Sequence, residues 1–174
     1  MTKLNTPLKL ALAAVFASLV FVATATFIIN IPSTSGYFNL GETTIYIAAL
    51  IIGPLTGAVA GGIGAMLADV YLTYAQFAPG TLAIKGVEGA IVGFLNLRLL
   101  KLTSNRTLSA TVSVIVGGLE MVAGYFIYEQ VVLGYPPALA LAEVPFNIVQ
   151  MIVGLVVAVP VMHAILRVFP QLKS

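Results

Sequence analysis

Six apolar runs, separated by short polar or Pro- and Gly-containing stretches, take up nearly all of this sequence of 174 residues. The first, residues 8–29, would form a helix about 33 Å long at 1.5 Å per residue, enough to cross the hydrocarbon core of a bilayer. Hydrophobic residues make up 60% of the chain and charged residues 8%, a composition typical of membrane proteins. The sequence therefore predicts an integral membrane protein.

The other runs predict five more helices, so the expected fold is all-α: a single domain, residues 1–174, built as a bundle of six transmembrane helices. We expect the helices at about residues 8–29, 40–55, 57–76, 81–101, 108–133 and 141–168. Residues 31–39 contain Pro, Ser and Gly and are expected to form a loop, and the Pro-Gly pair within residues 77–80 is expected to separate the third and fourth helices.

The basic residues predict the orientation of this bundle. If the amino terminus is cytoplasmic, the inner side receives seven of the eight Lys and Arg residues: Lys3, Lys9, Arg98, Lys101, Arg106, Arg167 and Lys173. Cytoplasmic segments of membrane proteins carry such an excess of Lys and Arg. We therefore expect both termini in the cytoplasm and a polar site that opens to the outside.

Ionisable residues inside apolar helices are costly unless they face a cavity, a partner or a pathway. At 100° per residue, three of the predicted helices each carry one polar stripe. The stripes are Asp69 with Thr73 and Gln76, Lys85 with Glu88 and Asn96, and Glu143 with Asn147 and Gln150. We expect a substrate cavity contacted by Asp69, Lys85, Glu88, Glu143, Asn147 and Gln150. The alternative is that Lys85 and Glu88 pair to hold helices together.

Aromatic residues gather near the outer side of the predicted bundle. Tyr37 and Phe38 lie in the first outer loop, where they could cover a pocket and stack on a ring-containing ligand. Four tyrosines near outer helix ends are instead expected to form an interfacial belt. These tyrosines are Tyr71, Tyr74, Tyr125 and Tyr128.

Small residues predict close helix contacts. Two glycine pairs have the GxxxG spacing, Gly57 with Gly61 and Gly89 with Gly93. The first helix carries two small stripes side by side, Ala13 with Ala17 and Ala14 with Ser18. These stripes suit docking to another membrane protein, and packing within the chain is the alternative.

Several classes of function are excluded on composition and motifs. The sequence has no cysteine and one histidine, His163, which has no ligand partners nearby, so we expect no metal and no cofactor. Hydrolase, metalloprotease and phosphate-loop motifs are absent, so the chain is not expected to be an enzyme or to hydrolyse ATP. A net charge of +2 is too small to predict a nucleic-acid partner.

Three segments resemble the substrate-binding S components of energy-coupling factor (ECF) vitamin transporters, and within these the riboflavin-type family. The segments are LAAVFASL, FNLGETTIYIAALIIGPLTGAVAGGIGAMLADV and APGTLAIKGVEGAIVG, between residues 12 and 93. The six-helix plan extends the resemblance over the rest of the chain.

The resemblance implies a multi-pass protein of the prokaryotic plasma membrane that captures a vitamin or vitamin precursor from outside. It would topple in the membrane and deliver the substrate through a T subunit energised by two ATPase subunits. The family's AxxxA docking motif maps onto Ala13 and Ala17, with Ala14 and Ser18 as the alternative register, and its first-loop lid maps onto residues 31–39. We favour riboflavin as substrate, with a pyridoxine-like or pyrimidine compound possible.

Two other classes of function remain open from the sequence. A free-standing secondary transporter or channel would suit six helices with intramembrane charges, although the sequence shows no inverted repeat. A membrane scaffold or enzyme would not bind a small molecule tightly, and an enzyme would need a catalytic constellation that the sequence does not show.

Overall fold

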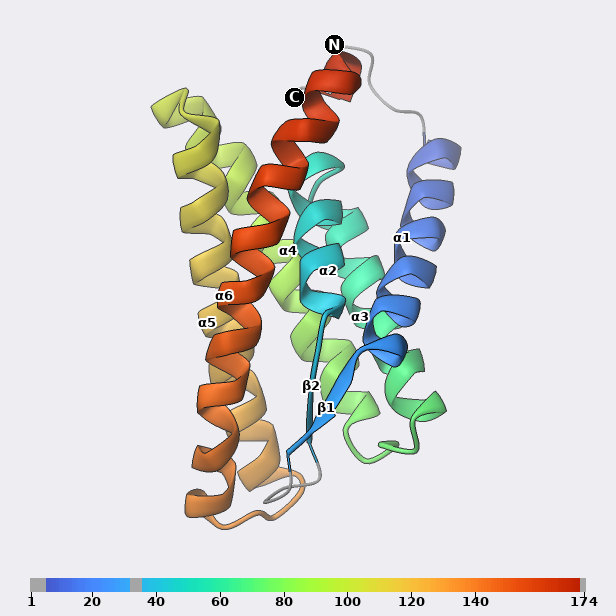
Figure 1. Ribbon diagram of the computed structural model, residues 1–174, viewed down its shortest axis with the longest axis vertical. Coiled ribbons are helices and arrows are strands. Elements are labelled where there is room, and N and C mark those ends of the chain that lie inside the picture. The colour runs from blue at the N-terminus through green and yellow to red at the C-terminus, as the bar shows by residue number, and fades with distance from the viewer. Residues whose placement is uncertain (1–5, 32–35, 173–174) are drawn as a thin grey trace.

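The computed structural model describes residues 6–31 and 36–172, in which six α-helices run roughly along one long axis with a β-hairpin packed at the front (Figure 1). The elements are α1 (Thr6–Thr26), β1 (Ile28–Asn30), β2 (Tyr37–Asn39), α2 (Gly41–Ile51), α3 (Pro54–Tyr71), α4 (Ala78–Thr103), α5 (Arg106–Val131), α6 (Pro137–Val168) and the 3-10 helix η1 (Pro170–Leu172). Six helices form at the six predicted places. Among the described residues, three of them are long and apolar enough to cross a membrane: α1, α5 and α6.

The six helices agree with the expected all-α class, but the segment between α1 and α2, predicted as a loop, also contains two short strands. There β1 and β2 pair antiparallel, with Ile28 opposite Asn39 and Asn30 opposite Tyr37. Branched and aromatic side chains favour extended backbone, which explains why these short segments pair. Residues 32–35 of the predicted loop lie outside the described residues.

The short helix α2 forms the centre of the core. Its residues Ile45, Tyr46 and Ala48 are at most 1% exposed, and they pack with Val92 of α4 and Val114 of α5. Because α2 has only 11 residues, it reaches part of the way along the bundle, and its amino-terminal end begins directly after the hairpin.

Helices α3 and α4 pack backbone to backbone, as the GxxxG pairs predicted. A Cβ atom added to Gly57 would lie 2.7 Å from the carbonyl oxygen of Gly89, and one added to Gly62 would lie 2.7 Å from that of Leu82. Neither contact leaves room for a side chain. Glycine at these positions is therefore what allows the two helices to approach so closely.

The third helix ends earlier than predicted. Helix α3 stops at Tyr71, and Thr73 takes a left-handed conformation with φ 70°. The predicted polar stripe of this helix is therefore wrong beyond Asp69, because Thr73 and Gln76 lie in the turn that follows. Helix α4 then begins at Ala78, so Pro79 lies in its first turn, where its missing N–H group costs nothing.

One of the two small stripes of α1 faces into the protein. Ala13 and Ala17 are 3% and 8% exposed, and α1 packs on α3, where a Cβ added to Gly64 would lie 2.8 Å from Val20. Ala14 and Ser18, on the adjacent stripe, are exposed. In the free chain, the small surface that α1 offers to a partner is therefore the second register.

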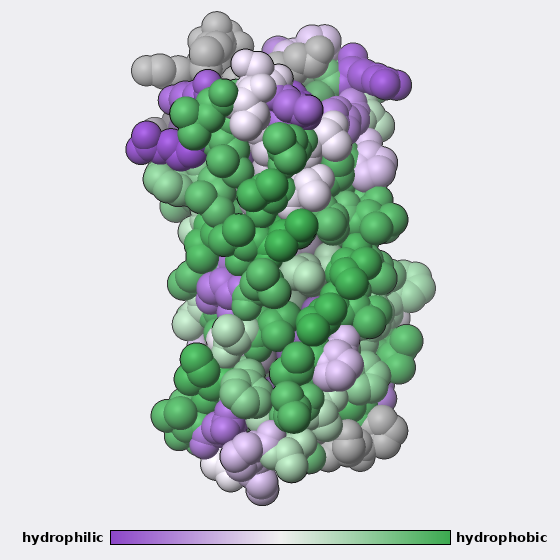
Figure 2. Space-filling view, turned by 90° about the vertical axis from the view of Figure 1, so that its left-hand side faces the viewer, coloured by the Kyte–Doolittle hydropathy of each residue, from purple (hydrophilic) through white to green (hydrophobic). Residues whose placement is uncertain are grey.

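Both ends of the described chain lie at the same end of the bundle (Figure 1). The carboxyl ends of α4 and α6 carry Lys101 and Arg167 there, and α5 begins with Arg106. Figure 2 shows hydrophobic residues over the middle of one face and hydrophilic residues gathered mainly toward its ends. Lys3 and Lys173 lie outside the described residues.

Candidate binding site

A cavity of about 510 Å³, including its open mouth, lies beside the hairpin, in the half of the bundle away from the termini. Every helix and β2 contribute to it. Its walls are formed by Thr24, Gly36, Tyr37, Asn39, Glu42, Ile45, Ala65, Asp69, Phe77, Thr81, Lys85, Tyr125, Glu143, Asn147 and Gln150.

The structure brings most of the predicted site residues together in this cavity. Six of the eight predicted site residues line the cavity: Tyr37, Asp69, Lys85, Glu143, Asn147 and Gln150. Phe38 does not, because successive side chains of a strand point to opposite faces and its neighbours Tyr37 and Asn39 are the ones that face the cavity. Glu88 lies behind the wall and is fully buried.

Lys85 is the centre of a buried hydrogen-bond network. Its ammonium group pairs with Glu42 at the start of α2, and its Nζ atom lies 3.4 Å from Glu88 Oε2 on its own helix. Gln150 of α6 donates to Glu42 Oε2 at 2.8 Å, and Gln150 Oε1 accepts from the backbone N–H of Asn39 at 2.9 Å. The network therefore joins α2, α4, α6 and the hairpin at one place.

The same network shows that the two interpretations of Lys85 are compatible. The pair with Glu42 links two helices, as an interhelical lock would, yet Lys85 and Glu42 also line the cavity. Glu88 is held from the other side by the hydroxyl of Tyr46, which donates to Oε1 at 2.8 Å. Glu88 thus supports Lys85 from behind.

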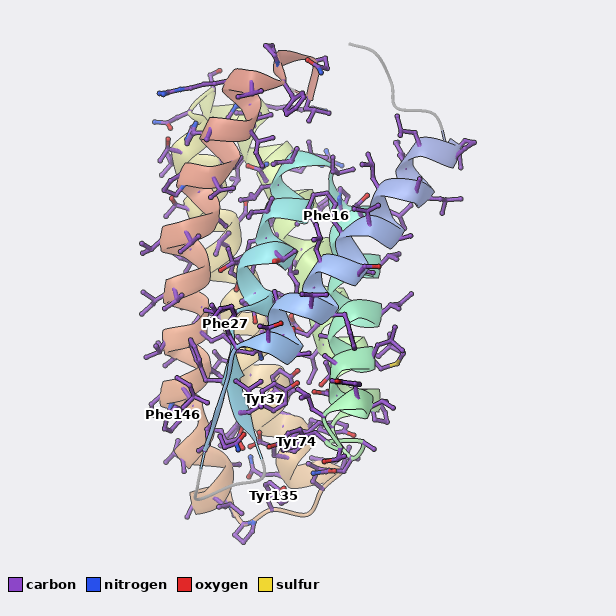
Figure 3. The ribbon with its side chains drawn as sticks, turned by 45° about the vertical axis from the view of Figure 1, so that its right-hand side comes forward. Phe16, Phe27, Tyr37, Tyr74, Tyr135 and Phe146 are labelled. Carbon is purple, nitrogen blue, oxygen red and sulfur yellow. The ribbon has the colours of Figure 1, made fainter. Side chains whose placement is uncertain are left out.

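The hairpin is tied to the end of α3 by tyrosines. The hydroxyl of Tyr37 donates to Asp69 Oδ1 at 2.5 Å, and that of Tyr74 donates to Asn30 Oδ1 at 3.1 Å. The two rings lie against each other, with centroids 4.7 Å apart (Figure 3). Burial is the main cause that raises the pKa of Tyr37 well above its usual value, and the nearby Asp69 carboxylate is the second. The hydroxyl therefore remains a donor.

Several lining residues were not predicted as site residues. Glu42 was missed because its role depends on a partner 43 residues away, although a buried lysine requires an acid. Tyr125 was expected in an interfacial belt, which is wrong: it lines the cavity, shares a hydrogen bond of 2.9 Å with Thr81 and has its ring 5.5 Å from Lys85 Nζ. Asn96, predicted on the polar stripe of Lys85, donates to Leu50 O instead, away from the cavity.

A membrane-capable helical bundle with a polar cavity at one end defines a membrane-embedded binding protein for a small polar molecule. The family model described as "ECF-type riboflavin transporter, S component" matches residues 4–167, and the chain belongs to this family. It is thus the S component of an ECF transporter, and its role is to capture a vitamin or vitamin precursor.

Two relatives and one solved structure are similar to this chain. The chain is 34% identical to the "Thiamine precursor transporter HmpT" of Lactococcus lactis subsp. cremoris (strain MG1363), over 86% of this chain and 82% of that protein. It is 43% identical to an uncharacterised protein of Pyrococcus woesei, over 74% and 82% of the two chains. A structure titled "Structure and mechanism of the S component of a bacterial ECF transporter" has the same fold, with a TM-score of 0.69 and 20% identity, covering 98% of this chain and 100% of that one.

Proposed function

We propose that the substrate is a small nitrogen heterocycle of the thiamine-precursor type, bound in the cavity beside the hairpin. The observation that carries the proposal is the character of the cavity wall. Its wall combines many hydrogen-bonding side chains with the aromatic rings of Tyr37, Phe77 and Tyr125, and its aliphatic residues are Ile45 and Ala65. A small ring rich in donors and acceptors can satisfy such a wall, and an unsatisfied buried polar group would be costly.

Riboflavin, which the sequence favoured, is the second candidate. The name of the family supports it. The aromatic side chains of Tyr37, Phe77 and Tyr125 would offer its flat ring system surfaces to stack on. The name of the relative from Lactococcus lactis supports the smaller, more polar substrate.

Mass spectrometry of the small molecules released from purified, denatured protein tests this proposal. We expect the released molecule to be a hydroxymethyl aminopyrimidine. We also expect ligand-free protein to bind the same compound in calorimetry. A released flavin, or tight binding of riboflavin alone, would reject the pyrimidine in favour of riboflavin. Binding of no compound in either class would contradict vitamin capture itself.

The remaining parts of the proposed function concern topology and partners. We propose six spans with both termini cytoplasmic, a cavity that opens outward under the hairpin, and delivery of the substrate by toppling against a T subunit driven by two ATPases. Support comes from the family and from the basic residues gathered where the termini lie. We place the docking surface on the exposed register of α1, Ala14 and Ser18, in place of Ala13 and Ala17, whose side chains are buried against α3.

A further inference from the structure

A second acidic cluster lies at the outer end of the cavity, apart from the Lys85 network. Glu129 of α5 and Glu143 of α6 lie on either side of the turn that joins these helices, near enough for their carboxyl groups to interact electrostatically. Glu129 is 0% exposed and Glu143 is 5% exposed. Two carboxyl groups are therefore buried together.

These carboxyl groups have few partners within the part of the chain that the structure describes. Both oxygens of Glu129 and the Oε1 atom of Glu143 are buried there without a hydrogen-bond partner. Both ion pairs found among the described residues belong to Lys85, which is already held by Glu42 and Glu88. Burying acids without a counter-charge is costly, so the pair does not serve the stability of the empty protein.

The position of the pair shows where its missing partner belongs. Glu143 lines the cavity, whereas Glu129 is not among the lining residues and lies behind it. The cavity wall also holds Glu42 and Asp69, against the one ammonium group of Lys85. Lys85 is shared between Glu42 and Glu88, so it does not supply a counter-charge for Glu143, and a bound molecule can supply one.

We propose that Glu143 forms an outer subsite for an amino group or basic ring nitrogen of the substrate, and that Glu129 is a positioning residue that strengthens this subsite from behind. The site therefore binds neutral or cationic amino-bearing rings and rejects anions such as phosphate esters. This inference rests on the proposed function, because it specifies which chemical class of heterocycle the same cavity accepts.

The test compares three probes in calorimetry on purified protein: 5-(hydroxymethyl)-2-methylpyrimidin-4-amine, the analogue with oxygen in place of the 4-amino group, and the phosphate ester of the amine. A charged hydrogen bond lost from a buried site lowers affinity by about tenfold or more. Glu143→Gln should therefore bind the amine at least about tenfold more weakly and lose most of the preference for the amine over the oxygen analogue. It should also discriminate less against the phosphate ester.

Glu129→Gln should shift the same preference for the amine by about threefold or more, although Glu129 does not line the cavity. A purely structural role would instead weaken both probes by the same factor. Gln130→Leu is the control, because Gln130 is the neighbour of Glu129 on α5, bonds to Phe126 O and does not line the cavity. It should leave the preference unchanged within about twofold.

Thermal unfolding without ligand gives a second readout. Removing one of two buried acids should leave the unfolding temperature of Glu129→Gln equal to or above that of the wild type, because repulsion is relieved. A marked loss of stability would overturn the inference. So would an unchanged preference in both variants while the wild type binds the amine, which would leave the proposed function standing. Failure of the wild type to bind any probe would overturn both.

Discussion

Lys85 on α4 pairs with Glu42 on α2, 43 residues earlier in the chain, while its distance to Glu88 on its own helix is 3.4 Å. The principal partner of the lysine is thus a residue of another helix. Removing one member of a buried pair leaves an uncompensated charge and costs about 3–5 kcal/mol.

We therefore expect Lys85→Met to lower the unfolding temperature of the ligand-free protein markedly, and the double variant with Glu42→Gln to recover part of that loss. Thermal unfolding of the wild type, both single variants and the double variant gives the coupling energy. Additive losses in the double variant would show that the pair does not contribute as a unit.

A second prediction concerns Asn147, which lines the cavity on α6. Asn147→Ala removes a hydrogen-bonding group from the site and should weaken ligand binding by about tenfold, since each 1.4 kcal/mol is a factor of ten. Asn96→Ala is the matched control: Asn96 is buried and bonds to Leu50 O outside the cavity, so its loss should lower stability and spare affinity. The reverse pattern in calorimetry and unfolding would move the site elsewhere.

The third prediction concerns the attachment of the hairpin through Tyr37. Tyr37→Phe keeps the ring against Tyr74 but removes the hydrogen bond to Asp69. We expect the bound ligand to dissociate several-fold faster, because a neutral hydrogen bond contributes about 1 kcal/mol. Stopped-flow dissociation measures this rate, with Tyr135→Phe, outside the cavity wall, as control. Equal rates in the wild type and Tyr37→Phe would mean that the hairpin does not control release.

The fourth prediction separates binding from transport through the two faces of α1. Ala14→Trp and Ser18→Trp place a large side chain on the exposed face, where it should block close helix contact with a partner and leave ligand affinity near that of the wild type. Ala17→Trp places it in a buried position and should destabilise the isolated protein. Uptake in cells, copurification of ATPase subunits and affinity in detergent are measured together. Normal uptake in both exposed-face variants would remove α1 from docking.

The fifth prediction is the topology. The sequence has no cysteine, so single-cysteine variants can be labelled cleanly in intact cells. A membrane-impermeant maleimide should label Gln76→Cys, in the exposed turn after α3, and should not label Ser104→Cys between α4 and α5 until the cells are opened. Labelling of Ser104→Cys from outside would contradict cytoplasmic termini.

The positions of the six helices could be predicted because apolar runs and GxxxG spacings can be recognised within one continuous segment of sequence. They failed where the structure depends on distant partners. The polarity of Glu42 was visible, but its pairing with Lys85 requires α2 and α4 to be packed together. The place of Tyr125 near an outer helix end also led us to predict an interfacial position, whereas this residue lines the cavity.

The early end of α3 has a different cause. Nothing in the apolar pattern after Asp69 distinguishes a helix from a turn, and Thr73 adopts its left-handed conformation only because the chain must reverse into α4. Likewise, the buried contact between Glu129 and Glu143 depends on how α5 and α6 meet, which helix periodicity alone does not determine.

The backbone contact between α3 and α4 bears on which parts of the site can move. Gly57 meets Gly89 without an intervening side chain, so these helices cannot slide or separate without breaking dense packing. We therefore expect Asp69 and Lys85, carried by the two helices, to form a rigid wall of the cavity. Movements that admit or release a ligand would then fall on the hairpin and α6, which form other parts of the wall.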